Sequence, residues 1–120
     1  MRTRVLLCDN DLTTRRSISH TLQKNLFTVE ILPQIVGYMD KIKLFDPDII
    51  LMDYILQGKT RDTALRLLTT DKETAHIPVV FMAKSEKIIP YANDFNKLYI
   101  QKPFDIDQLR AILNMYAIKH

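Results

Sequence analysis

Three charged side chains in this chain, each following a short apolar run, have types that suit phosphate and metal chemistry. They are Asp9, Asp53 and Lys102, and they lie far apart in the 120-residue sequence. Carboxylates can ligate a hard divalent cation such as Mg²⁺, and a lysine can neutralise an anionic group as a point charge. These side chains can act jointly only if the fold brings them to one place.

The apolar runs before these residues indicate strands that are covered on both faces. Continuous hydrophobicity is typical of parallel sheets sandwiched between helices, whereas a half-exposed strand alternates between apolar and polar residues. The four clear runs are Val5–Cys8, Ile49–Met52, Val79–Met82 and Leu98–Ile100, and a weaker fifth candidate is Phe27–Leu32.

Segments with helical spacing of apolar residues lie between the runs. The last one, 105–118, opens with Asp105 and Gln108 at the spacing of a capping box. The segment 85–96 fits poorly, because it carries Pro90 and has no clear apolar stripe, so we expect one or two distorted turns there. The stripes are Ile18, Leu22 and Leu26; Ile35, Met39 and Ile42; Ala64, Leu67 and Leu68; and Ile106, Leu109, Leu113 and Ala117.

Strands that alternate with helices predict an α/β protein with a doubly wound sheet of five parallel strands. The carboxyl ends of such strands meet at one edge, where ligands bind. Asp9 and Asn10 follow the first strand there, Asp53 the third and Lys102 the fifth. Asp11 also lies at this edge, and we predict that it is the N-cap of the first helix.

Length and composition predict one globular domain over residues 1–120, with 47% hydrophobic and 26% charged residues. The net charge is +3, but the Lys and Arg residues are scattered along the chain, which favours solvated helix faces over a nucleic-acid-binding surface. For Arg15–Arg16, contact with an acidic partner protein is an alternative. No run is long enough for a membrane span or signal peptide, which predicts a cytoplasmic location. The single Cys8 is expected to be buried and without redox chemistry.

The ordered set of these motifs resembles the response-regulator receiver domains of bacterial two-component signalling, over essentially the whole chain. In that family the aspartate matching Asp53 accepts a phosphoryl group from a histidine kinase. Lys102, Pro103 and Phe104 match the family's lysine, its structural proline and its aromatic residue. The resemblance implies the flavodoxin-like (βα)5 receiver fold.

The resemblance also implies how a phosphoryl group would be held. Phosphoryl transfer spreads negative charge over three oxygens, and catalysis consists mainly of positioning and of neutralising that charge. The implied Mg²⁺ ligands are Asp9, Asn10, Asp53 and the backbone carbonyl of Ile55, and the implied phosphoryl contacts are Lys102 and the backbone N–H of Lys84.

Two residues of the implied site, Ala83 and Asn10, depart from the family pattern. Ala83 replaces a Thr or Ser whose hydroxyl would bind the phosphoryl group and report its presence. A hydrogen bond to a charged group contributes about 1.5–3 kcal/mol. The coupling between phosphorylation and the switch should therefore weaken by about one to two orders of magnitude. Asn10 brings no charge, which should lower metal affinity. Tyr99 matches the family's switch aromatic, whose ring moves inward after the Thr or Ser hydroxyl on phosphorylation. With Ala83 there is no hydroxyl for the ring to follow. The alternative is that Tyr99 is an ordinary aromatic residue at a strand edge.

We therefore expect a receiver that accepts a phosphoryl group on Asp53 with Mg²⁺ and relays it through a weakened switch. It would be no enzyme beyond self-catalysed phosphoryl transfer and autodephosphorylation. The alternative, favoured by Ala83 and Asn10, is a phosphorylation-independent pseudo-receiver that serves as a docking module. Expected partners are a histidine kinase or phosphotransfer protein and a downstream protein, without nucleic acid or membrane; a weak homodimer stays an open alternative.

A phosphatase of the haloacid-dehalogenase type is a third hypothesis. The segment 5–13 resembles that family's first motif, in which Asp9 would be the nucleophile and Asp11 the general acid and base. The late acidic metal motif of that family has only Asp105 and Asp107 as counterparts here, and no cap segment excludes water. The sequence disfavours this hypothesis.

Overall fold

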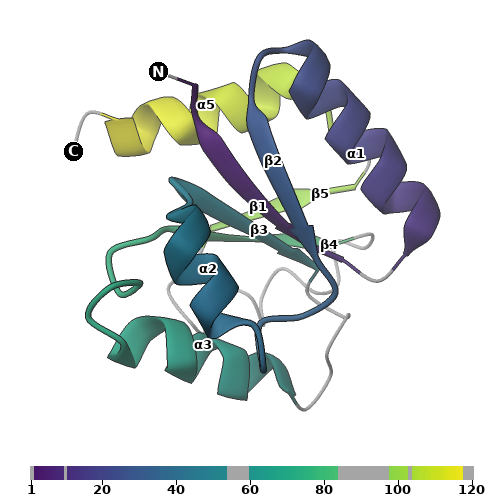
Figure 1. Cartoon of the computed structure of the whole chain (residues 1–120). Helices are drawn as coiled ribbons and strands as arrows, with labels where there is room; N and C mark the ends of the chain where they lie inside the picture. Colours follow the sequence, from purple (N-terminus) through teal and green to yellow (C-terminus); the bar gives the residue numbers. More distant parts are fainter. Residues whose placement is uncertain (1, 10, 54–59, 84–97, 103, 118–120) are drawn as a thin grey trace.

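The computed structural model describes residues 2–9, 11–53, 60–83, 98–102 and 104–117, and its strands form one five-stranded parallel sheet (Figure 1). The order β2-β1-β3-β4-β5 confirms the predicted doubly wound α/β fold, including the weak second strand. The poorly fitting segment 85–96 lies outside the described residues. The elements are β1 (Arg4–Cys8), α1 (Leu12–Lys24), β2 (Thr28–Leu32), α2 (Met39–Phe45), β3 (Ile49–Asp53), α3 (Thr60–Thr70), β4 (Val79–Ala83), β5 (Leu98–Gln101) and α5 (Ile106–Ala117).

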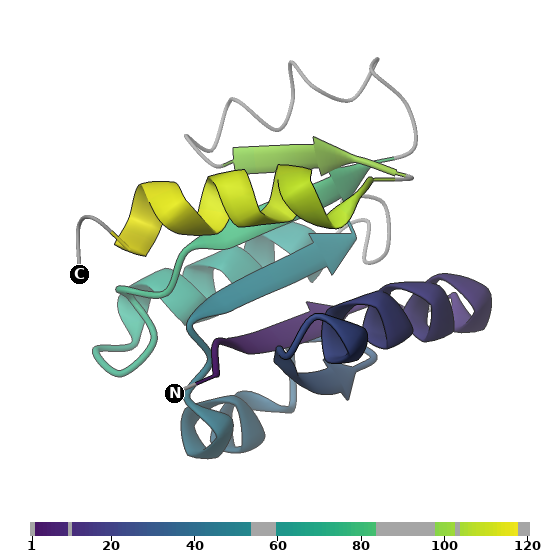
Figure 2. The ribbon, with the colours of Figure 1, turned by 90° about the horizontal axis from the view of Figure 1, so that it is seen from above.

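Helices cover both faces of the sheet, as the continuous apolar runs predict (Figure 2). Leu22 of α1 and Leu109 of α5 pack on one face of the sheet, against the strand side chains that point to that face. Ile42 of α2 and Leu68 of α3 pack on the opposite face, against the strand side chains that point to that face. The central strand β3 is fully covered from Ile49 to Met52. This double burial is the physical reason that its sequence shows no alternation.

The two caps expected from the sequence are present. The Asp11 side chain accepts a hydrogen bond from the Thr14 backbone N–H at 3.3 Å, so Asp11 is the N-cap of α1. The Asp105 N–H donates to Gln108 Oε1 at 3.0 Å, and the Gln108 N–H donates to Asp105 Oδ1 at 2.9 Å. This reciprocal pair is the predicted capping box, and it fixes the start of α5 at Ile106, shortly after Lys102.

Leu26 was expected on the buried stripe of α1, and this prediction is wrong. The helix ends at Lys24, and the backbone of Leu26 adopts the left-handed region with φ of 70°. The Phe27 N–H donates to the Leu22 carbonyl and the Leu26 N–H to the Gln23 carbonyl, which is a Schellman C-cap. Phe27 takes the place in the core, while Leu26 is 64% exposed.

Replacing Leu26 with glycine is expected to stabilise the protein by about 0.5–1 kcal/mol. A non-glycine residue pays about 1–2 kcal/mol in the left-handed region, and glycine's greater freedom in the unfolded chain offsets part of that gain. Urea unfolding measures the difference. Leu26→Ala, which removes the exposed side chain but keeps the backbone strain, should stay near the wild type; an equal gain in both variants would contradict the backbone explanation.

Ile35 was expected on the stripe of the second helix, but α2 begins only at Met39. Gly37, with φ of 88°, interrupts the helical backbone between them. Ile35 is nevertheless fully buried in the cluster beneath α2. Ile35 is therefore a core residue, as its place on an apolar stripe implied, although its backbone was assigned to the wrong element.

Two composition-based predictions have structural counterparts. Cys8 is buried in β1, and desolvation, followed by the neighbouring Asp9 carboxylate, raises the pKa of its thiol to about 12. The thiol is therefore protonated at neutral pH and unreactive. Within the described ranges, no helix is both long and apolar enough to cross a lipid bilayer.

Candidate functional site

The order of the strands places the first two candidate residues side by side. β1 and β3 are neighbours at the centre of the sheet, and the chain leaves them toward opposite edges. Asp9 directly follows β1, and Asp53 is the last residue of β3. Ligands of doubly wound sheets bind at this reversal of strand order, outside the carboxyl ends of the strands.

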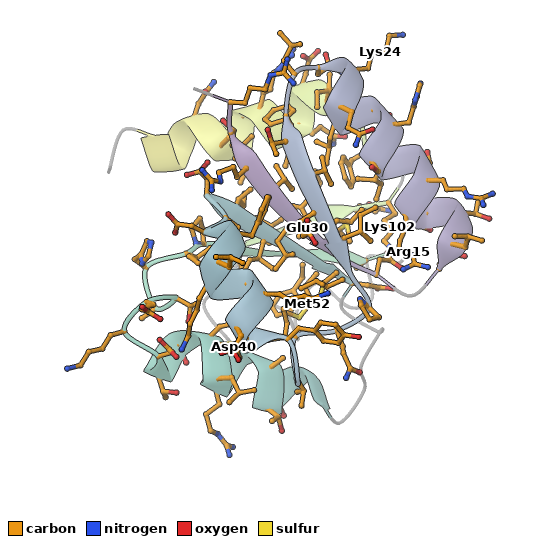
Figure 3. The ribbon with its side chains drawn as sticks, in the orientation of Figure 1. Arg15, Lys24, Glu30, Asp40, Met52 and Lys102 are labelled. Carbon is orange, nitrogen blue, oxygen red and sulfur yellow. The ribbon has the colours of Figure 1, made fainter. Side chains whose placement is uncertain are left out.

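Lys102 reaches the same place from the far side of β4. Its ammonium lies 2.7 Å from Asp9 Oδ2 and 3.5 Å from Asp53 Oδ2. The side chains of Lys102 and Asp9 are 7% and 0% exposed, whereas that of Asp53 is 18% exposed. The predicted convergence of Asp9, Asp53 and Lys102 is confirmed, and Asp53 is the carboxylate that solvent reaches. Figure 3 shows Lys102 at the end of the sheet where α1 begins.

Both oxygens of Asp9 accept hydrogen bonds. Oδ2 accepts from the Lys102 ammonium, and Oδ1 accepts from the Asp11 backbone N–H at 2.9 Å. Sequence reasoning missed this second donor, since every non-proline residue carries an N–H and only the turn into α1 decides where it points. The buried Asp9 carboxylate is therefore compensated by one cation and one backbone donor, which burial of a charge requires.

The backbone of Lys102 is fixed by β4. Its N–H donates to the Ala83 carbonyl at 2.7 Å, which extends the pairing of β4 and β5 by one residue beyond β5. Ala83 is 3% exposed, and its neighbour Met82 pairs with Asp53 across the sheet. Residue 83 therefore stands beside the site, as predicted, and has no hydroxyl to offer it.

The remaining predicted site residues are not placed. Tyr99 belongs to β5, but its side chain lies outside the described residues. Four others lie wholly outside them, namely Asn10, Ile55, Lys84 and Pro103.

The described part of the site carries two carboxylates and one ammonium. Mg²⁺ is usually held by one or two carboxylates together with waters, and Asp9 and Asp53 fit that donor set. Among the described residues, no three His, Cys, Asp or Glu side chains gather as a metal centre. The fit is therefore to a partial, water-completed shell in which the Lys102 ammonium already bridges the same two carboxylates.

Comparison with known sequences gives a family match over most of the chain. The model of the response regulator receiver domain matches residues 5–114. The chain is 30% identical to a two-component response regulator-like protein of Arabidopsis thaliana, APRR1, over 97% of this chain and 19% of the plant protein. It is 25% identical to hybrid signal transduction histidine kinase D of Dictyostelium discoideum, over 96% of this chain and 8% of the kinase. The chain thus spans less than a fifth of these curated relatives.

Solved structures show the same fold at lower identity. The receiver domain of the sensor histidine kinase PA1611 from Pseudomonas aeruginosa, which has a magnesium ion coordinated in its active site cleft, has a TM-score of 0.80. It is 19% identical, and the match covers 96% of this chain and 97% of that one. The chemotaxis response regulator CheY4 of Vibrio cholerae has a TM-score of 0.79 at 19% identity, covering 96% and 98% of the two chains.

Proposed function

Because this chain belongs to the response regulator receiver domain family, we propose that it accepts a phosphoryl group on Asp53 and passes the signal to a protein partner. The observation that carries this proposal is the Lys102 ammonium lying between Asp9 and the more exposed Asp53, at 2.7 and 3.5 Å, where the strand order reverses. Membership of the family supports a role in two-component signalling.

The proposed step is an in-line displacement at phosphorus. An oxygen of Asp53 forms the new bond to phosphorus, while the bond to the donor breaks and the donor leaves with its electron pair. Asp53 suits this role because its side chain is the most exposed of the three. Lys102 would neutralise charge on the transferred group, and Asp9 would hold that ammonium in place.

Magnesium is the proposed cofactor. When bound, it would neutralise charge on the phosphoryl oxygens and align them with the attacking oxygen. The proposed ligands are Asp9, Asn10, Asp53 and the Ile55 carbonyl, and the magnesium ion of the Pseudomonas receiver domain supports the choice of metal. Because Asn10 is uncharged, we expect weaker binding than a third carboxylate would give.

The proposed donor is a histidine kinase or a phosphotransfer protein, and the receiver would act stoichiometrically, with only self-catalysed transfer and autodephosphorylation. The similarity to a hybrid histidine kinase supports this class of partner. The relay is proposed to be weak, because Ala83 offers no hydroxyl and Tyr99 therefore has none to follow. The same feature favours the second candidate function, a docking module that works without phosphorylation.

Asp53→Asn is expected to abolish phosphoryl incorporation. The wild type, incubated with Mg²⁺ and acetyl phosphate, should gain one phosphoryl group in its intact mass, and the amide of the variant cannot act as the nucleophile. Asp107→Asn, whose side chain is 88% exposed on α5, is the matched control and should behave as wild type. Equal gain in Asp53→Asn would contradict the assignment, and no gain in folded wild type would favour the docking module.

A further inference from the structure

The side of α1 that faces β2 carries a basic cleft with no role in the site described above. Its volume is about 410 Å³, within the range of small-molecule sites. Lys102 is absent from its walls, because the groove that includes Lys102 lies along a different stripe of α1. The polar walls of the cleft are Arg15, Arg16, Ser19, His20 and Gln23, all from α1.

Arg15 holds a buried donor without an acceptor. Its Nε atom is buried, and within the described part of the chain it has no hydrogen-bond partner. A guanidinium offers five N–H donors in a fixed planar fork and no acceptor, so a hydrogen-bond acceptor such as an anionic oxygen can satisfy it. Buried polar groups in proteins are nearly always paired, and an unpaired one calls for an explanation such as strain, a catalytic role, or a bound water or ion.

Among the residues that the structure describes, no carboxylate lines the walls of this cleft. Asp11, one turn earlier, is the helix cap and accepts hydrogen bonds from Thr14. Glu30 alternates along β2 with Val29 and Ile31, and these two pack on the α1 face of the sheet, so the Glu30 side chain points to the other face. Figure 3 shows Arg15 on the first turns of α1 and Glu30 separately on β2.

The apolar part of the cleft is provided by Leu12 and Ile31. Leu12 is 50% exposed, and it is one of three large hydrophobic side chains with such exposure in the described residues. An exposed leucine next to two arginines can cover the organic part of a ligand whose anionic part meets the guanidinium groups. Arginine is preferred for phosphate because its fork binds two oxygens at once.

We propose that the cleft between α1 and β2 binds a small organic phosphate, with Arg15 and Arg16 on the phosphate and Leu12 and Ile31 against the organic portion. The cleft's volume of about 410 Å³ suits a small ligand better than an extended acidic peptide. The site is separate from Asp53, and it would let a phosphorylated metabolite bind the receiver whether or not Asp53 is phosphorylated.

The test is a calorimetric titration of the full chain with adenosine monophosphate and with inorganic pyrophosphate, without divalent cation and at 0.15 M salt. Without Mg²⁺ and a phosphodonor, Asp53 phosphorylation does not contribute, so failure of this proposal leaves the proposed function intact. Arg15→Gln should weaken binding of both probes at least about tenfold, the loss of a charge-assisted contact. Lys24→Gln, at an exposed basic residue in the last turn of the same helix, should change it less than about twofold.

Arg15→Lys keeps the charge but removes the buried Nε donor, and it serves as the second variant if Arg15→Gln does not fold. It should also lose affinity, because a lysine cannot reproduce the planar fork. Equal losses in the Arg15 and Lys24 variants would show diffuse charge attraction and overturn the proposal. Absence of binding by the wild type, or binding of a poly-glutamate peptide but of neither phosphate probe, would overturn it as well.

Discussion

Lys102→Met is expected to lower the free energy of unfolding by about 3 kcal/mol. The substitution leaves the fully buried Asp9 carboxylate without its cation, and removing one partner of a buried ion pair costs about 3–5 kcal/mol. We place the loss at the low end, because the Asp11 N–H still donates to Asp9. Urea unfolding of the variant and the wild type measures it.

The double variant Asp9→Asn with Lys102→Met is the control for this result. It removes both charges, so its loss of stability should be clearly smaller than the sum of the two single losses, with a coupling of about 1–3 kcal/mol. A Lys102→Met variant within about 0.5 kcal/mol of the wild type would mean that the ion pair does not organise the site.

Ala83→Ser is expected to raise the affinity for beryllofluoride, a noncovalent phosphoryl mimic, by about 10- to 100-fold in the presence of Mg²⁺. The added hydroxyl would donate to the bound group, and a hydrogen bond to a charged group contributes about 1.5–3 kcal/mol. Residue 83 stands at the carboxyl end of β4, and its carbonyl accepts from the Lys102 N–H. Fluorescence or calorimetric titration measures the affinity.

The wild-type alanine is itself the matched control for the serine, because the two differ only in the hydroxyl. The gain should disappear when Asp53→Asn is added, since the mimic would then lack its carboxylate. An unchanged affinity in Ala83→Ser would show that residue 83 does not face the phosphoryl group and that the weakened switch has another origin.

The fold was largely predictable because the strongest signals were buried strands. Leu6, Leu51 and Phe81 lie on strands covered by helices on both faces, and such strands show continuous hydrophobicity. The errors came at helix ends. Leu26 has the correct spacing for the stripe, but Phe27 packs in the core and Leu26 turns outward at a C-cap that periodicity does not register.

The convergence of Asp9, Asp53 and Lys102 was predictable, but the contacts among them were not. Parallel strands share one edge, so Asp9, Asp53 and Lys102 had to converge. The Lys102 ammonium lies closer to Asp9 than to Asp53, and this difference depends on side-chain packing, which a sequence pattern does not contain. The same holds for Lys43 of α2, which pairs with Asp71 just after the end of α3; this hydrogen bond raises the pKa of Lys43 and lowers that of Asp71.

The most direct test of the central claim is to locate the phosphoryl group. After incubation with Mg²⁺ and acetyl phosphate, borohydride reduction converts an aspartyl phosphate to homoserine, which peptide mass spectrometry assigns to a position. The account predicts homoserine at position 53 in the wild type and at no position in Asp53→Asn. Homoserine at position 9, where a phosphatase of the haloacid-dehalogenase type would carry its nucleophile, would contradict the account.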